Sequence, residues 1–230
     1  MPNNIKDFII ENSHENQRNH NHFKIFGFID LYIKDQLPQN IDILKVIEQV
    51  EEKIPFHLTN EIEAFYVGSF KEFEEKQVNA MYLDGAVYVT NDQDNIPDMV
   101  DDIIHEIAHA MESIFERQIY SDSKIQTEFL GKRERLREML SQYGYFDKKD
   151  ISFSNLEYSK ELDDFLYKDL GYDKLETFCI GLFIKPYSAT DLREYFASAF
   201  EEYLLGDMEY LKRISPIAFD KVHFIYKGEV

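Results

Sequence analysis

The spacing of hydrophobic and polar positions predicts strands in the first part of this chain and helices in the second. Apolar runs rich in aromatic and β-branched residues are typical of strands. Such runs occupy residues 23–33, 63–70 and 80–90. Apolar residues that recur every three or four positions predict amphipathic helices. They do so over residues 41–53, 97–117, 122–143, 154–169, 172–183, 190–206 and 215–227.

Strands first and helices later favour an α+β fold, with a small N-terminal sheet followed by a mostly helical C-terminal part. The polar stretch at residues 11–22 predicts a loop, and neither a repeat nor a Pro/Gly/Ser-rich linker marks a domain boundary. A chain of 230 residues, of which 44% are hydrophobic, can bury a sizeable core. We therefore expect one domain over residues 1–230.

Residues 105–109 read His-Glu-Ile-Ala-His, which is the H-E-x-x-H pattern. Positions four apart lie on one face of a helix, so His105 and His109 can reach one cation while Glu106 leans toward a water on it. Neutral imidazole is a good ligand for zinc, and an unfilled coordination position leaves room for a reactive water. The motif predicts a zinc site with Glu106 as its general base.

The residues around this motif have the pattern of an amphipathic helix. Pro97 and the acidic residues of the first turn are typical of a helix start. A broad apolar face lies opposite the two histidines. It is formed by Met99, Val100, Ile103, Ile104, Ile107, Ala108, Met111, Ile114 and Phe115. A surface helix with two solvated histidines would show the same pattern, so the prediction depends on a further ligand.

A catalytic zinc site usually has three protein ligands. The metzincin arrangement is excluded, because Glu112 and Phe115 stand where that class has glycine and histidine. The other histidines are scattered, which favours a downstream carboxylate. The helix expected at 190–206 carries Glu194 and Glu201 on one stripe, and small residues between them would allow close approach to a neighbour. The sequence alone does not show which of the two glutamates would be the ligand. An acidic stripe that is merely exposed to solvent would have the same sequence pattern.

The segment from Tyr187 to Phe200, YSATDLREYFASAF, resembles the anthrax lethal factor peptidase family and the related clostridial Pro-Pro endopeptidases. In that family a tyrosine precedes the ligand glutamate by seven positions, and an aromatic-Phe-Ala-x-Ala/Ser-Phe run follows. The resemblance implies a zincin fold, with Glu194 as third ligand and Tyr187 as the phenol that stabilises the transition state. It extends from about Ala80 to the C-terminus.

The chain differs from the family pattern in two respects, and each difference leads to a further expectation. Ser198 stands where the family commonly has an acidic residue that can support a ligand histidine, so this support must come from elsewhere or be absent. The segment between His109 and Tyr187 is longer than usual, so residues 122–169 are expected to form a helical insertion. Residues 1–60 are an N-terminal extension of open role.

Charge and composition limit the classes of molecule that this protein is expected to bind. A formal net charge of −19 argues against nucleic acid, because binding to phosphates relies on Lys and Arg. The acidic excess favours basic peptides, although it also simply keeps a protein soluble. The single cysteine, Cys179, excludes an internal disulfide or a thiolate zinc cluster. No membrane span or secretory leader is recognisable, so we expect a cytoplasmic protein, or an effector delivered to another cell.

Together these features predict a zinc-dependent endopeptidase that hydrolyses peptide bonds with metal-activated water. Residues 82–89 are the natural candidate for an edge strand that pairs with an extended peptide, although an internal strand fits the same residues. The alternative is a catalytically inactive, zinc-bound binding or regulatory module on a peptidase fold. The presence of both Glu106 and Tyr187 argues against it, because a structural metal site needs neither a base nor a transition-state phenol.

Overall fold

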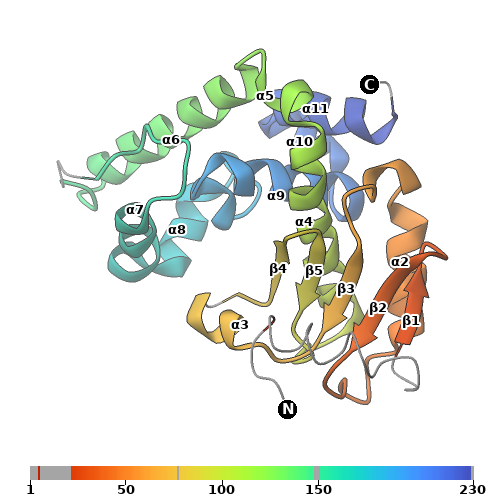
Figure 1. Ribbon diagram of the computed structural model, residues 1–230. Coiled ribbons are helices and arrows are strands. Elements are labelled where there is room, and N and C mark those ends of the chain that lie inside the picture. The colour runs from red at the N-terminus through yellow and green to blue at the C-terminus, as the bar shows by residue number, and fades with distance from the viewer. Residues whose placement is uncertain (1–4, 6–21, 77, 148–150, 229–230) are drawn as a thin grey trace. The chain divides into compact units, whose positions relative to one another are not determined.

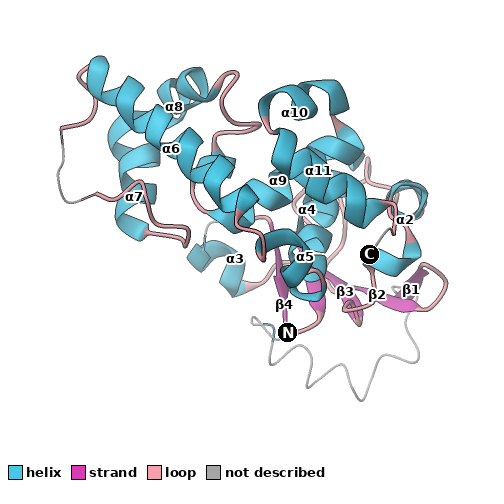
Figure 2. Ribbon diagram, turned by 90° about the horizontal axis from the view of Figure 1, so that it is seen from above, coloured by secondary structure: helices cyan, strands magenta, loops and turns pink. Residues whose placement is uncertain are grey.

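The computed structural model describes residue 5 and residues 22–76, 78–147 and 151–228. They form two compact units, unit 1 at residues 1–114 and unit 2 at 115–230. The strands lie in unit 1, and unit 2 is built from helices (Figure 1, Figure 2). The expected α+β class is therefore confirmed. Among the described residues, none of the helices combines the length and the apolar character of a transmembrane span.

Several expectations about the loops and domains of the chain are not tested by the described residues. The loop predicted at 11–22 lies outside the described residues, apart from His22. The single domain over 1–230, the extension at 1–60 and the insertion at 122–169 stay predictions.

A five-stranded sheet in the order β1-β2-β3-β5-β4 is the framework of unit 1. The strands are β1 (His22–Ile25), β2 (Ile29–Ile33), β3 (Ala64–Val67), β4 (Ala80–Leu83) and β5 (Ala86–Val89). The three inner strands run parallel, and β1 and β4 pair antiparallel at the two edges. Since alternate side chains point to opposite faces, the burial of every residue of β5 shows that both faces of this strand are covered.

Two predicted strands turn out to be hairpins. The run at 23–33 divides into β1 and β2, and the run at 80–90 divides into β4 and β5. Asp84 and Gly85 connect the second pair with φ angles of 49° and 82°, the left-handed conformation that a two-residue hairpin turn needs. The segment 82–89 was therefore wrongly predicted to be one strand. Its first residues belong to β4 at the edge, and the rest to the internal β5.

Helix α4 (Ile96–Ile114) carries the H-E-x-x-H motif and packs against α2 (Ile43–Lys53) and against β4 and β5 (Figure 1). The side chain of Asn95 accepts a hydrogen bond from the backbone N–H of Asp98 at 3.0 Å, which caps the start of α4. The apolar face predicted for this helix is buried as far as Met111, and Ile114 is partly buried. The helix expected to run to residue 117 ends at Ile114. The short η1 (Phe56–Leu58) and α3 (Lys71–Lys76) were not predicted.

Unit 2 consists of helices arranged about a central one, α9. The elements are α5 (Glu116–Tyr120), α6 (Lys124–Gln142), α7 (Lys160–Asp164), η2 (Phe165–Gly171), α8 (Tyr172–Cys179), η3 (Tyr187–Ala189), α9 (Leu192–Leu205), α10 (Met208–Ile214) and α11 (Pro216–Tyr226). Helix α9 packs against α6, α10, α11 and η3. The helix predicted at 154–169 begins only at Lys160 and continues as the π-helical η2, and α10 was not predicted.

Polar side chains of α6 hold these helices together. The Glu128 carboxylate accepts hydrogen bonds from the backbone N–H groups of Ile217 and Ala218, at 2.8 and 3.0 Å, and from the Tyr195 hydroxyl at 2.8 Å. It therefore caps α11 and fixes α9 with one group. One turn further, Lys132 donates to two backbone carbonyls, and burial lowers its pKa to about 8.

Candidate metal site

Helix α4 presents His105 and His109 on the same face, one turn apart. Their ring centroids are 5.0 Å apart and their planes are inclined by 78°, so one imidazole meets the other edge to face. Both side chains are partly buried. Surface histidines on an isolated amphipathic helix would be solvated, whereas these two are held in a partly dehydrated environment where they can share a ligand.

Glu106 lies between the two histidines in the sequence and is 8% exposed. Its Oε2 accepts a hydrogen bond of 2.6 Å from the backbone N–H of Tyr82 on β4. In the β4–β5 register, Met81 and Leu83 face Tyr88 and Ala86, while Thr90 donates to the carbonyl of Asn79. The N–H of Tyr82 therefore points away from β5, toward the open side of the edge strand. This contact, which the sequence did not reveal, fixes the orientation of the carboxylate.

Glu112 supplies a carboxylate near His109 that the sequence reasoning did not recognise. The side chain is 6% exposed, and its Oε2 lies 3.6 Å from Nδ1 of His109. Ser198, where the related family has an acidic residue, is buried and makes no hydrogen bond through its hydroxyl within the described residues. A carboxylate three residues along the same helix face was the available signal. Outer carboxylates of this kind orient imidazole ligands and raise their basicity.

The two glutamates that the sequence left open have different surroundings in unit 2. Glu201 is 5% exposed and its carboxylate is paired with the ammonium of Lys185. Glu194 lies in the first turn of α9. The Asp191 side chain accepts a hydrogen bond of 3.0 Å from the backbone N–H of Glu194 and so caps the helix. Glu201 is therefore engaged in an ion pair.

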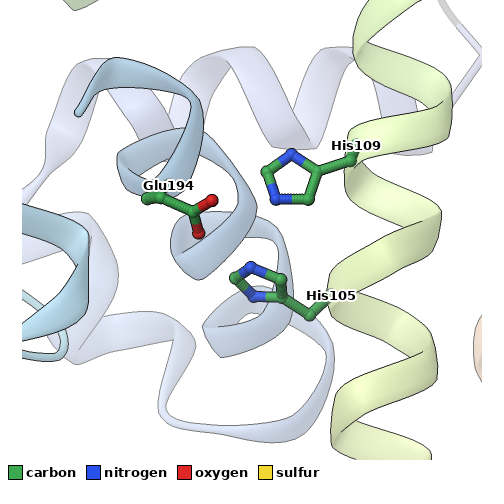
Figure 3. A group of neighbouring side chains, drawn as sticks. All are labelled: His105, His109 and Glu194. Atoms are coloured by element: carbon green, nitrogen blue, oxygen red, sulfur yellow. The ribbon is translucent and has the colours of Figure 1, made fainter. Parts of the chain in front are cut away.

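His105, His109 and Glu194 form a group that could hold a metal ion. One ligand atom from each residue lies within 4.8 Å of those of the other two. Figure 3 shows the two imidazole rings and the Glu194 carboxylate turned toward one another. A search of the described residues for three or more His, Cys, Asp or Glu side chains with such closely spaced ligand atoms finds this one group. Two imidazole nitrogens and one carboxylate oxygen suit a divalent transition metal.

Tyr187 belongs to η3, directly before α9, and 42% of its surface is exposed. Burial of its phenol and the negative charge of Glu194 raise the pKa of Tyr187 well above its usual value. The hydroxyl therefore keeps its proton at neutral pH and can donate a hydrogen bond. Tyr167 of η2 has a buried hydroxyl with no hydrogen-bond partner in the described part of the chain, and this burial raises its pKa, with a smaller contribution from the charge of Glu194.

Comparison of the chain with models of protein families, with curated proteins and with solved structures finds no match. What the group of His105, His109 and Glu194 can do is therefore argued from the residues around it.

Proposed function

We propose that this protein is a zinc-dependent endopeptidase with a zincin-like catalytic fold. The observation that carries the proposal is the convergence of ligand atoms from His105, His109 and Glu194 within 4.8 Å, with the Glu106 carboxylate on the same helix as the histidines. Two neutral imidazoles and one carboxylate are a ligand set of catalytic zinc, which keeps a further position open. The resemblance of the segment 187–200 to lethal factor-like peptidases supports the same assignment.

Each side chain then has a distinct task in hydrolysis. Zinc bound by the three residues would polarise the scissile carbonyl and lower the pKa of a water molecule toward neutrality. Glu106 accepts a proton from this water as the oxygen attacks the carbonyl carbon, and passes the proton to the amine nitrogen when the C–N bond breaks. Tyr187 donates a hydrogen bond to the carbonyl oxygen as negative charge develops there. Water and peptide are consumed, and a carboxylic acid and an amine are released.

The edge strand β4 is the proposed place for an extended peptide. Residues at a sheet edge leave backbone donors and acceptors open to a further strand. The outward N–H of Tyr82 is already bonded to Glu106, which places the proposed general base beside the edge where a peptide added to β4 would lie. Basic peptides are the expected class, given the net charge of −19.

The proposal is tested by metal analysis and peptide hydrolysis on the same preparation. The purified chain, loaded with zinc and desalted, is expected to retain about one ion per molecule and to cleave members of a peptide library. A chelator is expected to abolish cleavage, and added zinc to restore it. Retained zinc without any cleavage would favour the binding-module alternative, and failure to retain any metal would refute both.

Replacing Tyr187 by Phe is expected to lower kcat by about 100-fold, because one hydrogen bond to the developing oxyanion is lost while binding in the ground state changes little. The variant Tyr143→Phe provides the control, since Tyr143 is 71% exposed and lies at the end of α6. Steady-state kinetics on one cleaved peptide and zinc content measure the two effects. A rise in KM with kcat unchanged would show that Tyr187 only binds substrate.

Replacing Glu112 by Gln is expected to weaken zinc binding by about 10- to 100-fold, because an amide beside Nδ1 of His109 neither carries negative charge nor raises the basicity of the imidazole. Competition with a chromophoric zinc chelator measures the affinity. Glu116→Gln, a change of the same kind at an exposed position of α5, serves as the control. Equal affinities of Glu112→Gln and wild type would remove Glu112 from the site.

A further inference from the structure

A cavity of about 450 Å³ opens in unit 2 beside Tyr187. Its volume is within the range of about 300–1,000 Å³ that is typical of ligand sites. Most of its wall is aromatic or aliphatic, and Tyr172, Ile180, Phe183, Pro186 and Tyr210 contribute to it. Tyr187 is therefore shared between this cavity and the surroundings of Glu194, whose charge acts on its phenol.

Large apolar side chains are exposed around the mouth of the cavity. Ile180 is 76% exposed, Tyr172 is 53% exposed and Tyr187 is 42% exposed. Single exposed apolar residues are common on proteins, but several of them around one hollow are typical of a binding site. Contact with an apolar group would remove this surface from water, which is favourable.

The segment that forms one wall, residues 180–186, is fixed by hydrogen bonds at several points. The Gly181 N–H donates to the Tyr210 hydroxyl at 3.1 Å, and Lys132 Nζ donates to the Leu182 carbonyl at 2.5 Å. Gly181 has a φ of 71°, which a residue with a side chain adopts only with strain. A preformed wall lowers the entropy lost when a ligand binds, because little has to be ordered.

The polar groups of the cavity offer little to a charged ligand. Lys185 forms an ion pair with the buried carboxylate of Glu201. Cys179 is buried, which raises the pKa of its thiol to about 12, so the thiol stays neutral. Glu176 is a carboxylate of the lining and disfavours acidic ligands. An acidic ligand is therefore disfavoured, and the aromatic and aliphatic side chains that form most of the wall match an apolar group.

We propose that this cavity binds a bulky apolar side chain, aromatic or of leucine size, of the peptide whose scissile carbonyl is contacted by Tyr187. The inference rests on the proposed endopeptidase function, since Tyr187 is what links the cavity to the candidate metal ligands. It adds a substrate class, namely peptides with a large apolar residue close to the bond that is cut.

Binding is testable without catalysis, because the chain contains no tryptophan and the indole of a ligand can be excited selectively. N-acetyl-tryptophanamide is titrated with metal-free protein and its emission is followed. A saturable blue shift is expected, with an affinity that falls about tenfold in Ile180→Asp and in Tyr172→Ala. Tyr143→Ala removes an exposed ring that does not line the cavity, and is expected to bind like wild type. Equal affinities in all four proteins would overturn the proposal.

Hydrolysis separates failure of this inference from failure of the function itself. Zinc-loaded wild type is compared with Ile180→Asp on peptides that differ only in one residue near the cleaved bond. The expected result is a preference of wild type for Phe or Leu over Ala of about tenfold or more, which is lost in the variant. The same preference in both proteins overturns the cavity assignment alone. No cleavage of any peptide overturns the endopeptidase proposal, and with it the identity of the occupant as a substrate.

A second copy of this chain is the other occupant to be distinguished. Sedimentation of wild type and Ile180→Asp at equal concentration is expected to give the same monomer mass. A dimer that is lost in the variant would show that the apolar rim serves self-association, and would overturn the substrate proposal.

Discussion

Glu106→Gln is expected to lower kcat/KM for peptide hydrolysis by about a thousandfold while zinc stays bound. The amide of glutamine cannot take a proton from water at neutral pH, so the step that generates the nucleophile loses its base. Its oxygen can still accept the hydrogen bond from the Tyr82 N–H, so the packing between α4 and β4 is retained. Kinetics on one peptide, together with zinc content from mass spectrometry, separate the chemical defect from a loss of metal.

The matched control is Glu116→Gln, which makes the same chemical change at an exposed position. It is expected to hydrolyse peptide at the wild-type rate. If wild type and Glu106→Gln both hold zinc and are equally inactive, the protein is a zinc-bound binding module rather than an enzyme. If Glu106→Gln retains zinc-dependent hydrolysis close to wild type, another group is the general base.

Glu194→Ala is expected to abolish retention of zinc, because two imidazoles from one helix leave the ion with only two protein ligands. The metal content after desalting is expected to fall from about one ion per chain to a small fraction of that. His109→Ala should behave alike. Because Glu194 lies on the surface of the first turn of α9 and is only partly buried, the loss is expected without unfolding, which thermal denaturation by circular dichroism checks.

Glu201→Gln distinguishes between the two glutamates of α9. The Glu201 carboxylate is paired with Lys185, so we expect this variant to keep its zinc, with some loss of thermal stability from the broken charge pair. An exposed position on α6, Glu138→Ala, controls for the loss of one acidic charge. Retention of zinc by Glu194→Ala and its loss in Glu201→Gln would reverse the assignment of the third ligand.

Much of the secondary structure follows from the spacing of residues along the chain. Helices α2, α4, α6 and α9 were predicted within a few residues from the spacing of their apolar positions. In α2 and α9 an Asp caps the start, a signal that the prediction did not use. The errors lie where local turn chemistry interrupts an apolar run. Asp84 and Gly85 form a strong hairpin signal that the run at 80–90 concealed, and Asp207 caps the short α10 that was not predicted.

The residues of the candidate site also fall into those that the sequence could predict and those that it could not. His105, Glu106 and His109 could be recognised from the sequence because an α-helix by itself places positions four apart on one face. The position of Glu112 beside His109 follows from the same geometry but was not recognised. The contact of Glu106 with the Tyr82 N–H could not be predicted, because it depends on which side of β4 remains at the edge of the sheet.

The sequence by itself determined the α+β class, the helix that carries both histidines and the pair of glutamates from which a third ligand would come. These are local properties, set by side-chain periodicity and helix geometry. The tertiary structure decided that Lys185 pairs with Glu201, that Glu194 lies within reach of both imidazoles, and that an apolar cavity opens beside Tyr187. The reason is that each of these depends on how residues distant in the chain pack, and packing follows from the summed burial of many side chains rather than from any one motif.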